Sequence, residues 1–347
     1  MRIMRRVFTP PQHLRCNSNE CQKDAKRINW IDWAKAIGIY LVVTGHANHN
    51  NADVVPMIFM IHMPLFFVIS GFLFKTESTL RELMIRSFRG LVIPYLLYNI
   101  IASIYWILLG GIKSIMGQPY DWHTCIITPA VNTILGDSIN CFDGPTWFLL
   151  ALIWCKLFSW LLHRGNRFVK VGTIMICAIM WYIRIQSTDA FYFFLDSGLA
   201  GFIWFEIGHV CKHYIKHRYI PRTALLTLLV FGAISCYIVC MQVGKCDYVL
   251  SKTNGIIGIL GSGAGLISFF SLCHLLNGIS LNIVTSISRA SIVIMCLHMQ
   301  IQSWMEIAIH YQGPEVQTFA VDFIIIMLLT ALFPLIKKYA PILLGGR

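Results

Sequence analysis

Apolar residues gather along this chain in runs close to 20 residues long, and short polar segments separate one run from the next. A run of about 20 apolar residues lets a helix cross the hydrocarbon core of a bilayer. Backbone groups in that core must be satisfied within the segment, which favours helices over other structures. The pattern therefore predicts an all-α integral membrane protein with about ten transmembrane helices. We expect these helices at residues 33–50, 55–74, 91–110, 145–163, 169–186, 198–212, 222–242, 254–274, 290–310 and 317–336.

The polar segments between the runs differ in how much lysine and arginine they carry. If the N-terminus is cytoplasmic, all but a few of the 28 cationic residues fall in cytoplasmic segments or at cytoplasmic helix ends. The exceptions are Lys113, Arg184, Lys245 and Lys252, which are expected outside, and Lys156, which lies within a span. Cytoplasmic loops of membrane proteins show this cationic excess. The distribution predicts that the N- and C-termini are both cytoplasmic.

The first part of the chain differs from the rest. Residues 1–28 are polar and basic, and they lack the apolar core of a cleavable signal peptide. We expect a cytoplasmic extension without fixed structure there, followed by one transmembrane domain over residues 29–340. No internal repeat divides that domain.

The composition agrees with a membrane domain. Hydrophobic residues make up 56% of the chain, charged residues only 13%, and the mean hydropathy is +0.65. A soluble domain would carry roughly a quarter charged residues. The net charge of +12 does not indicate nucleic-acid binding, because no basic stretch is interleaved with aromatic residues in a folded module. Most of the twelve cysteines lie in apolar runs, where cysteine behaves as a small hydrophobic residue.

Ionisable side chains within membrane spans are costly and mark candidate functional sites. Lys35 and His46 are eleven residues apart, which is about 16 Å and about three full turns along a helix. Both would therefore face the same way, with the lysine at the cytoplasmic end and the imidazole about halfway across the bilayer. Asp32, one turn earlier, could pair with Lys35. On spacing alone, a snorkelling lysine with an unrelated histidine is the alternative explanation.

The stretch GHANHNNADVVPMIFMIHMPLFFVISG contains His46, His49, Asp53 and His62, and this raises the question of a metal site. An HxxH pair without a second pair of ligands is a weak zinc motif. His49 and Asp53 also lie in an asparagine-rich segment typical of a solvated turn. We therefore expect no metal, with His46 on the first helix, His49 in an external turn and His62 on the second helix.

A second group of candidates lies in the segment KTESTLRELMIRSFRGLVIPY. Arg86 and Arg89 are three residues apart on a helix that leads into the third span. Two guanidinium groups on one face suit a phosphate or a pyrophosphate. Their role as cationic topology determinants remains an open alternative.

Several segments resemble the acyltransferase 3 family of integral-membrane O-acyltransferases. The runs RINWIDWAKAIGIYLVVTGHAN, MIHMPLFFVISGFLFK and RSFRGLVIPYLLYN carry the resemblance, and GPTWFLLALI, FIWFEIGHVCKHYI and ISRASIVIMCLHMQI extend it over about residues 27–335. The chain is most similar to short members related to fucose 4-O-acetylases and polysaccharide O-acetylases. The family's motif of a basic residue followed by histidine falls on Lys35 and His46, with lysine where arginine is usual. Its paired-arginine motif falls on Arg86 and Arg89.

The resemblance implies a membrane O-acyltransferase in the bacterial inner membrane. Cytoplasmic acyl-CoA, expected to be acetyl-CoA, would be a co-substrate rather than a permanently bound cofactor. The acceptor would be a sugar hydroxyl in a surface or exported glycan. Arg86, Arg89 and Lys35 would hold the phosphates of the donor, and His46 would be the general base, because neutral imidazole is available at working pH. The expected orienting or substrate-binding residues are His62, Asp32, Trp147, Glu306 and His298.

A secondary transporter or flippase for a sugar or an acyl group is the alternative. Many spans with ionisable groups suit that class as well, although transporters often consist of two similar halves, which are not apparent here. The sequence identifies neither the acceptor nor the oligomeric state.

Overall fold

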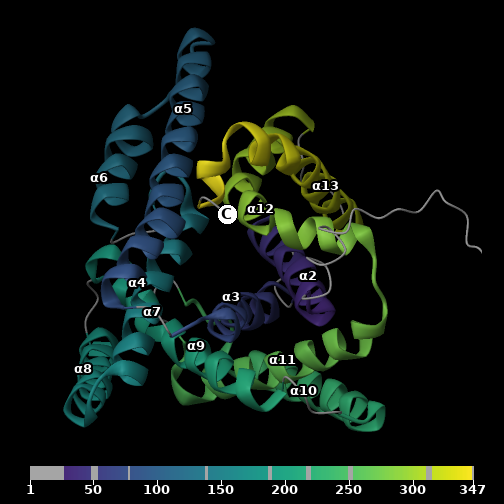
Figure 1. The fold of residues 1–347 in the computed structure, drawn as a ribbon. Helices are drawn as coiled ribbons and strands as arrows, with labels where there is room; N and C mark the ends of the chain where they lie inside the picture. The colour runs from purple at the N-terminus through teal and green to yellow at the C-terminus, as the bar shows by residue number, and fades with distance from the viewer. Residues whose placement is uncertain are drawn as a thin grey trace, which may run out of the picture.

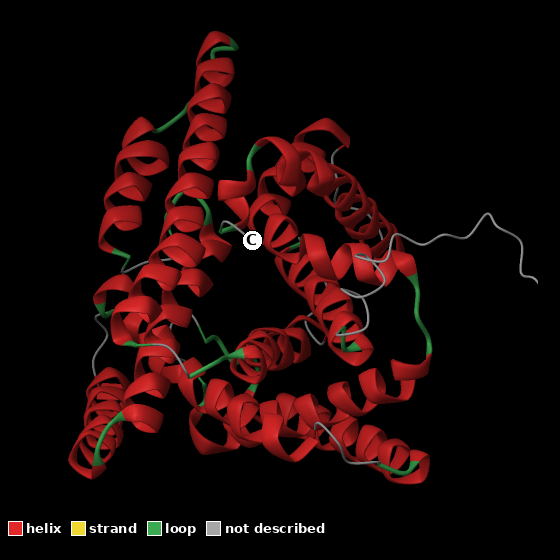
Figure 2. Ribbon diagram, viewed as in Figure 1, coloured by secondary structure: helices red, strands yellow, loops and turns green. Residues whose placement is uncertain are grey.

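The computed structural model describes residues 27–47, 54–76, 79–136, 140–186, 190–215, 220–248, 253–309 and 315–345. All the regular elements in these ranges are helices, and the ranges contain no strand (Figure 2). The predicted all-α architecture is confirmed for this part of the chain. The predicted extension falls almost entirely outside it, because residues 1–26 are not described.

Helices of 18 residues or more follow each predicted span, usually within a few residues. They are α2 (Asn29–His46), α3 (Val54–Leu73), α5 (Ile93–Ile115), α7 (Trp147–Arg164), α8 (Arg167–Gln186), α9 (Leu195–Ile215), α10 (Arg222–Val243), α11 (Gly255–Leu275), α12 (Asn282–Ile309) and α13 (Glu315–Tyr339). The shorter elements are α4 (Leu80–Ser87), α6 (Thr128–Leu135), the π-helical turns η1 (Phe88–Val92) and η2 (His123–Ile127), and the 3₁₀ turns η3 (Gly144–Thr146), η4 (Tyr192–Phe194), η5 (Leu276–Gly278) and η6 (Pro341–Leu344).

Seven helical segments in the described residues are long and apolar enough to cross a membrane. They are Val55–Leu73, Leu80–Ile115, Gly144–Arg164, Arg222–Val243, Gly255–Gly278, Asn282–Met305 and Thr318–Tyr339. The other three long helices, α2, α8 and α9, are not among these segments. The chain is therefore a multi-pass membrane protein by length and composition, while the count of ten crossings and the cytoplasmic termini remain predictions.

The first helix ends earlier than the hydrophobic pattern indicates. It was expected to reach residue 50, but α2 ends at His46, and the backbone N–H of Ala47 bonds back to the carbonyl of Thr44. Asparagine competes for backbone hydrogen bonds and so favours caps and turns over helix interiors, which fits an end near the asparagine-rich segment. His46 consequently lies on the last turn of its helix rather than in the middle.

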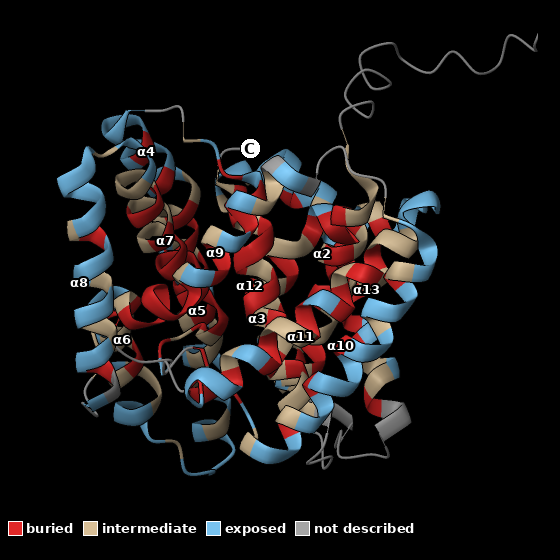
Figure 3. Cartoon of the chain, turned by 90° about the horizontal axis from the view of Figure 1, so that it is seen from below, coloured by how far each residue is buried: buried red, intermediate tan, exposed pale blue. Residues whose placement is uncertain are grey.

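Helix α3 lies at the centre of the bundle, where it packs against α2, α9 and α11 (Figure 1). On one side of it, α12 packs between α2 and α13, and these three helices share an apolar core that includes Val43, Ile294 and Ile325. On the other side, α3, α7, α9 and α11 enclose a second core. Buried residues concentrate in these central helices, whereas α8 lies at the edge and is largely exposed (Figure 3).

Candidate functional site

Three histidines from three different helices come together inside the bundle. His46 ends α2, His62 lies near the middle of α3 and His298 lies near the middle of α12. The rings of His46 and His298 are 5.4 Å apart between centroids, and His62 interacts electrostatically with both of the others. His62 and His298 are 1% and 0% exposed, whereas His46 is exposed. The group therefore has one accessible imidazole with two buried ones behind it.

Backbone carbonyls determine the tautomers of the two buried rings. The Nδ1 of His62 lies 2.7 Å from the carbonyl oxygen of Ile58. The Nδ1 of His298 lies 3.0 and 2.9 Å from the carbonyl oxygens of Ile294 and Met295. Because a carbonyl only accepts, Nδ1 must carry the hydrogen in both rings, and a neutral ring then has its lone pair on Nε2. No described residue makes a hydrogen bond to the buried Nε2 of His298.

A lysine and an aromatic ring complete the surroundings of His46. The ring of Phe59 makes T-shaped contacts with both His46 and His62. The ring centroids are 6.0 Å apart in the first pair and 4.9 Å apart in the second. The Nζ of Lys245 lies 3.6 Å above the Phe59 ring and 3.8 Å from a carboxylate oxygen of Asp247. Both charged residues interact electrostatically with His46. The sequence predicts Lys245 outside without a role and does not single out Asp247, because nothing in the α10–α11 loop indicates that it reaches the end of α2.

Asp32 lies at the opposite end of α2 from His46. The 14 residues between them span about 21 Å of helix. Its carboxylate accepts two hydrogen bonds from Arg27, at 2.6 and 2.9 Å, and a third from the hydroxyl of Ser288 at 2.6 Å. The structure thus joins Asp32 to Arg27 and the start of α12, and it does not bring this carboxylate to the histidines.

The predicted donor-binding cations lie in two separate places. Lys35 is half-buried on α2, whereas Arg86 and Arg89 are exposed on α4 and η1. Helix α4 packs against α7, and both views of the fold show it well apart from α2 (Figures 1 and 3). The structure therefore keeps the two arginines close in sequence but does not bring Lys35 beside them.

Trp147 and Glu306 are the remaining predicted substrate-binding residues, and the structure describes the side chain of only the first. Trp147 is 4% exposed and packs among Phe67, Phe148 and Phe194, with ring centroids 6.0 to 6.5 Å apart. It is therefore part of the aromatic core between α3 and α7. Glu306 is a residue of α12 whose side chain lies outside the described part of the chain.

The loop before α7 is held by one asparagine. The side-chain amide of Asn99 donates to the carbonyl of Tyr95 and the hydroxyl of Thr146, and its oxygen accepts from the hydroxyl of Thr133 and the N–H of Asp143. All four distances lie between 2.9 and 3.2 Å. This network anchors the backbone of Asp143, whose side chain is 1% exposed.

The Asp143 carboxyl is electrostatically unusual. Burial raises its pKa well above the usual value, and the nearby Gln300 amide offsets only part of that rise. No hydrogen bond of ordinary geometry reaches either carboxyl oxygen from the described residues. The sequence does not single out this carboxyl, because the DGP motif in which it stands is common in turns.

In the described part of the chain, no group of three or more His, Cys, Asp or Glu is arranged to hold a metal ion. His49 and Asp53, which the sequence placed in the external turn, lie outside the described residues.

Comparison with known proteins adds one finding. A family model described as an acyltransferase domain matches residues 28–338. Searches of curated proteins and of solved structures returned no significant match.

Proposed function

Because the chain belongs to the acyltransferase 3 family, we propose that it moves an acyl group, expected to be acetyl, from cytoplasmic acyl-CoA to a sugar hydroxyl. The acceptor is a surface or exported glycan, and the reaction takes place in the bacterial inner membrane. The apolar helices and the family support membrane acyl transfer. The donor, the acceptor and the compartment are part of the proposal.

The observation that carries the proposal is the meeting of His46, His62 and His298. These residues lie far apart in sequence, and packing the imidazoles together inside an apolar bundle is costly unless they are used. His46 is the accessible member and can reach a substrate. His298 lies directly behind it and presents a lone pair that no described residue satisfies.

In the proposed reaction, His46 removes the proton from the acceptor hydroxyl as the hydroxyl oxygen attacks the thioester carbonyl carbon. The carbon–sulfur bond then breaks, the coenzyme A thiolate leaves, and the proton returns to it. His298 and His62 act as positioning residues that orient and support the His46 ring. Lys245, close to His46, stabilises negative charge on the carbonyl oxygen in the tetrahedral transition state.

The phosphates of the donor bind at the cytoplasmic side through Arg86 and Arg89. Guanidinium groups recognise phosphate through paired hydrogen bonds. Lys35 lies on the face of α2 that leads to His46, about 16 Å away, and there it contacts the donor closer to the thioester. In this role Lys35 and the arginine pair engage separate parts of one extended molecule.

The test uses the purified protein in nanodiscs, labelled acetyl-CoA and a glycan acceptor. We expect transfer that depends on both substrates, and a loss of about 10²- to 10⁴-fold in kcat for His46→Ala. His274→Ala is the matched control, because His274 stacks on Trp30 at 4.7 Å and bonds to the carbonyl of Phe270, away from the three-histidine group. Near-normal transfer by folded His46→Ala would remove this residue as the base.

The transporter alternative predicts a different outcome in the same system. Reconstituted protein would then move a sugar or an acyl group across the membrane at a rate that does not depend on acyl-CoA, and labelled acetyl would not appear on the acceptor. That result would overturn the proposed transfer.

A further inference from the structure

A groove of about 460 Å³ runs between α12 and α13. On the α12 side it is lined by Ile283, Ser286 and Arg289, which recur every three residues and are all exposed. The α13 side contributes Met327, Thr330, Ala331, Phe333, Pro334 and Lys337. The volume is within the range of small-molecule sites.

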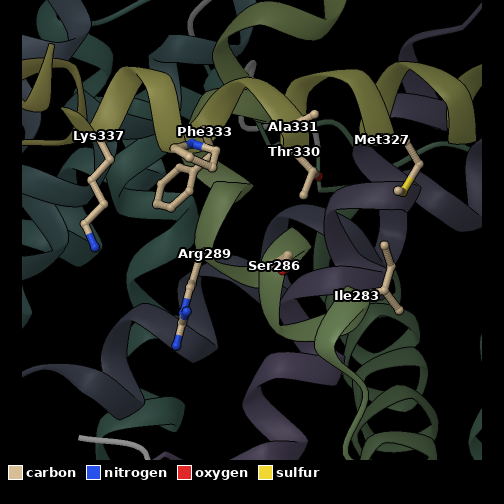
Figure 4. Close-up of a pocket in the computed structure, with 9 residues that line it drawn as sticks. Ile283, Ser286, Arg289, Met327, Thr330, Ala331, Phe333 and Lys337 are labelled. Carbon is tan, nitrogen blue, oxygen red and sulfur yellow. The ribbon is translucent and has the colours of Figure 1, made fainter. Parts of the chain in front are cut away.

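The groove has a polar end and an apolar end (Figure 4). Arg289 and Lys337 lie at one end, and Ile283 and Met327 at the other. Ser286, from α12, lies between them. An occupant that matches this order has an anionic group at one end and an aliphatic chain at the other.

The groove is on a different side of α12 from the three-histidine group. Nine residues separate Arg289 from His298, which is about two and a half turns, so the two side chains leave the helix in opposite directions. His298 is 0% exposed within the bundle, while Arg289 is exposed. The groove therefore does not open towards His46.

The neighbouring surface of α13 is typical of a lipid-facing helix. Only 22% of the 18-residue apolar stretch in Thr318–Tyr339 is buried. Leu328, Leu332 and Leu335 on this helix are 57%, 36% and 55% exposed. A ligand in the groove would thus be continuous with the surrounding acyl chains.

We propose that this groove binds an anionic phospholipid, with its phosphate between Arg289 and Lys337 and an acyl chain along the apolar side of α13 towards Met327. The guanidinium of Arg289 carries its five N–H donors in a planar fork, a geometry that matches phosphate oxygens. The hydroxyl of Ser286 adds a further donor beside it. Basic pockets between transmembrane helices are suited to anionic lipid headgroups. This site goes beyond acyl transfer and does not depend on it.

The experiment measures lipid retention by native mass spectrometry. Protein is exchanged into nanodiscs containing phosphatidylcholine and phosphatidylglycerol, and retained lipid is identified after release. Wild-type protein should preferentially retain phosphatidylglycerol, and a combined Arg289→Gln and Lys337→Gln variant should lose this preference by roughly tenfold or more. Lys338→Gln is the matched control, because Lys338 is an exposed neighbour outside the groove.

A second pair of variants tests the middle of the groove, where Ala331 lies (Figure 4). Ala331→Trp fills the groove and should also abolish retention, whereas Leu335→Trp, on the adjacent exposed surface, should not. Equal retention of phosphatidylcholine and phosphatidylglycerol by wild-type protein would overturn the proposal. So would loss of retained lipid on addition of coenzyme A or inorganic phosphate, because the groove would then be a site for a soluble phosphate compound. Neither the measurement of lipid retention nor the competition by coenzyme A or phosphate depends on acyl transfer.

Discussion

At the scale of single residues, the structure separates side chains that the sequence grouped and joins others that it kept apart. Asp32 and His46 lie on one helix but at opposite ends, whereas His298 comes from 252 positions later in the chain and packs against His46. A spacing argument works within one helix, where rise and rotation are regular. It cannot supply the third histidine, because that contact depends on how α12 packs on α2.

Asp143 leads to a prediction about pH. Its folded pKa is raised by burial, so the folded chain keeps this proton after the unfolded chain has lost it, and stability falls as pH rises above about 4. Asp143→Asn removes the titration while the Asn99 contacts to the loop backbone remain. We expect the variant to melt at least about 2 °C higher than wild type at pH 7, with little difference at pH 4. Tryptophan fluorescence melting at both pH values checks this, and an equal shift at the two pH values would contradict it.

At the scale of elements, the contact between α3 and α9 depends on two glycines. A Cβ added to Gly71 would collide with the carbonyl oxygen of Phe205, and one added to Gly208 would collide with that of Val68. The two helices therefore touch backbone to backbone, which small residues permit in membrane proteins. This contact holds α3, and with it His62, in the centre of the bundle.

Gly71→Ala and Gly208→Ala should each destabilise the protein, because neither backbone can move aside without separating the helices. Overpacking of this kind costs about 1–3 kcal/mol. Thermal stability in detergent, followed by size-exclusion chromatography after heating, measures the effect. Gly172→Ala is the control, since an added Cβ at this helical position on α8 meets no atom within 4 Å. Unchanged stability of both variants would show that the two helices can separate.

At the scale of the whole molecule, hydrogen bonds join certain helix ends. If consecutive long helices cross the membrane in opposite directions, these ends lie on the same side of it. Asn29 at the start of α2 donates to the carbonyls of Asn277 and Ile279, between α11 and α12. Arg164 at the end of α7 and Lys212 near the end of α9 donate to the carbonyls of Thr76 and Phe74, just after α3. These links agree with consecutive long helices that run in opposite directions.

Cytoplasmic termini follow from this order together with the cationic residues, and we predict them for the intact protein. A green fluorescent protein fused to the C-terminus should fluoresce, and an alkaline phosphatase fused there should be inactive in cells. A phosphatase fusion after α10, in the loop that contains Lys245, should be active. An active phosphatase at the C-terminus would contradict the predicted orientation.

The sequence by itself determined the helical membrane class, the approximate position of the long helices and the family, because hydrophobic runs and short motifs are local properties of the chain. It also singled out His46 as the base and, through the family resemblance, His62 and His298 as orienting or substrate-binding residues, without indicating which of the named residues meet. The tertiary structure decided that the three rings meet, that Lys245 lies beside them, and that α12 and α13 form an amphipathic groove. These features depend on contacts between helices distant in sequence, and such contacts are set by side-chain packing and by close approaches such as Gly71 on Phe205, which no local pattern records.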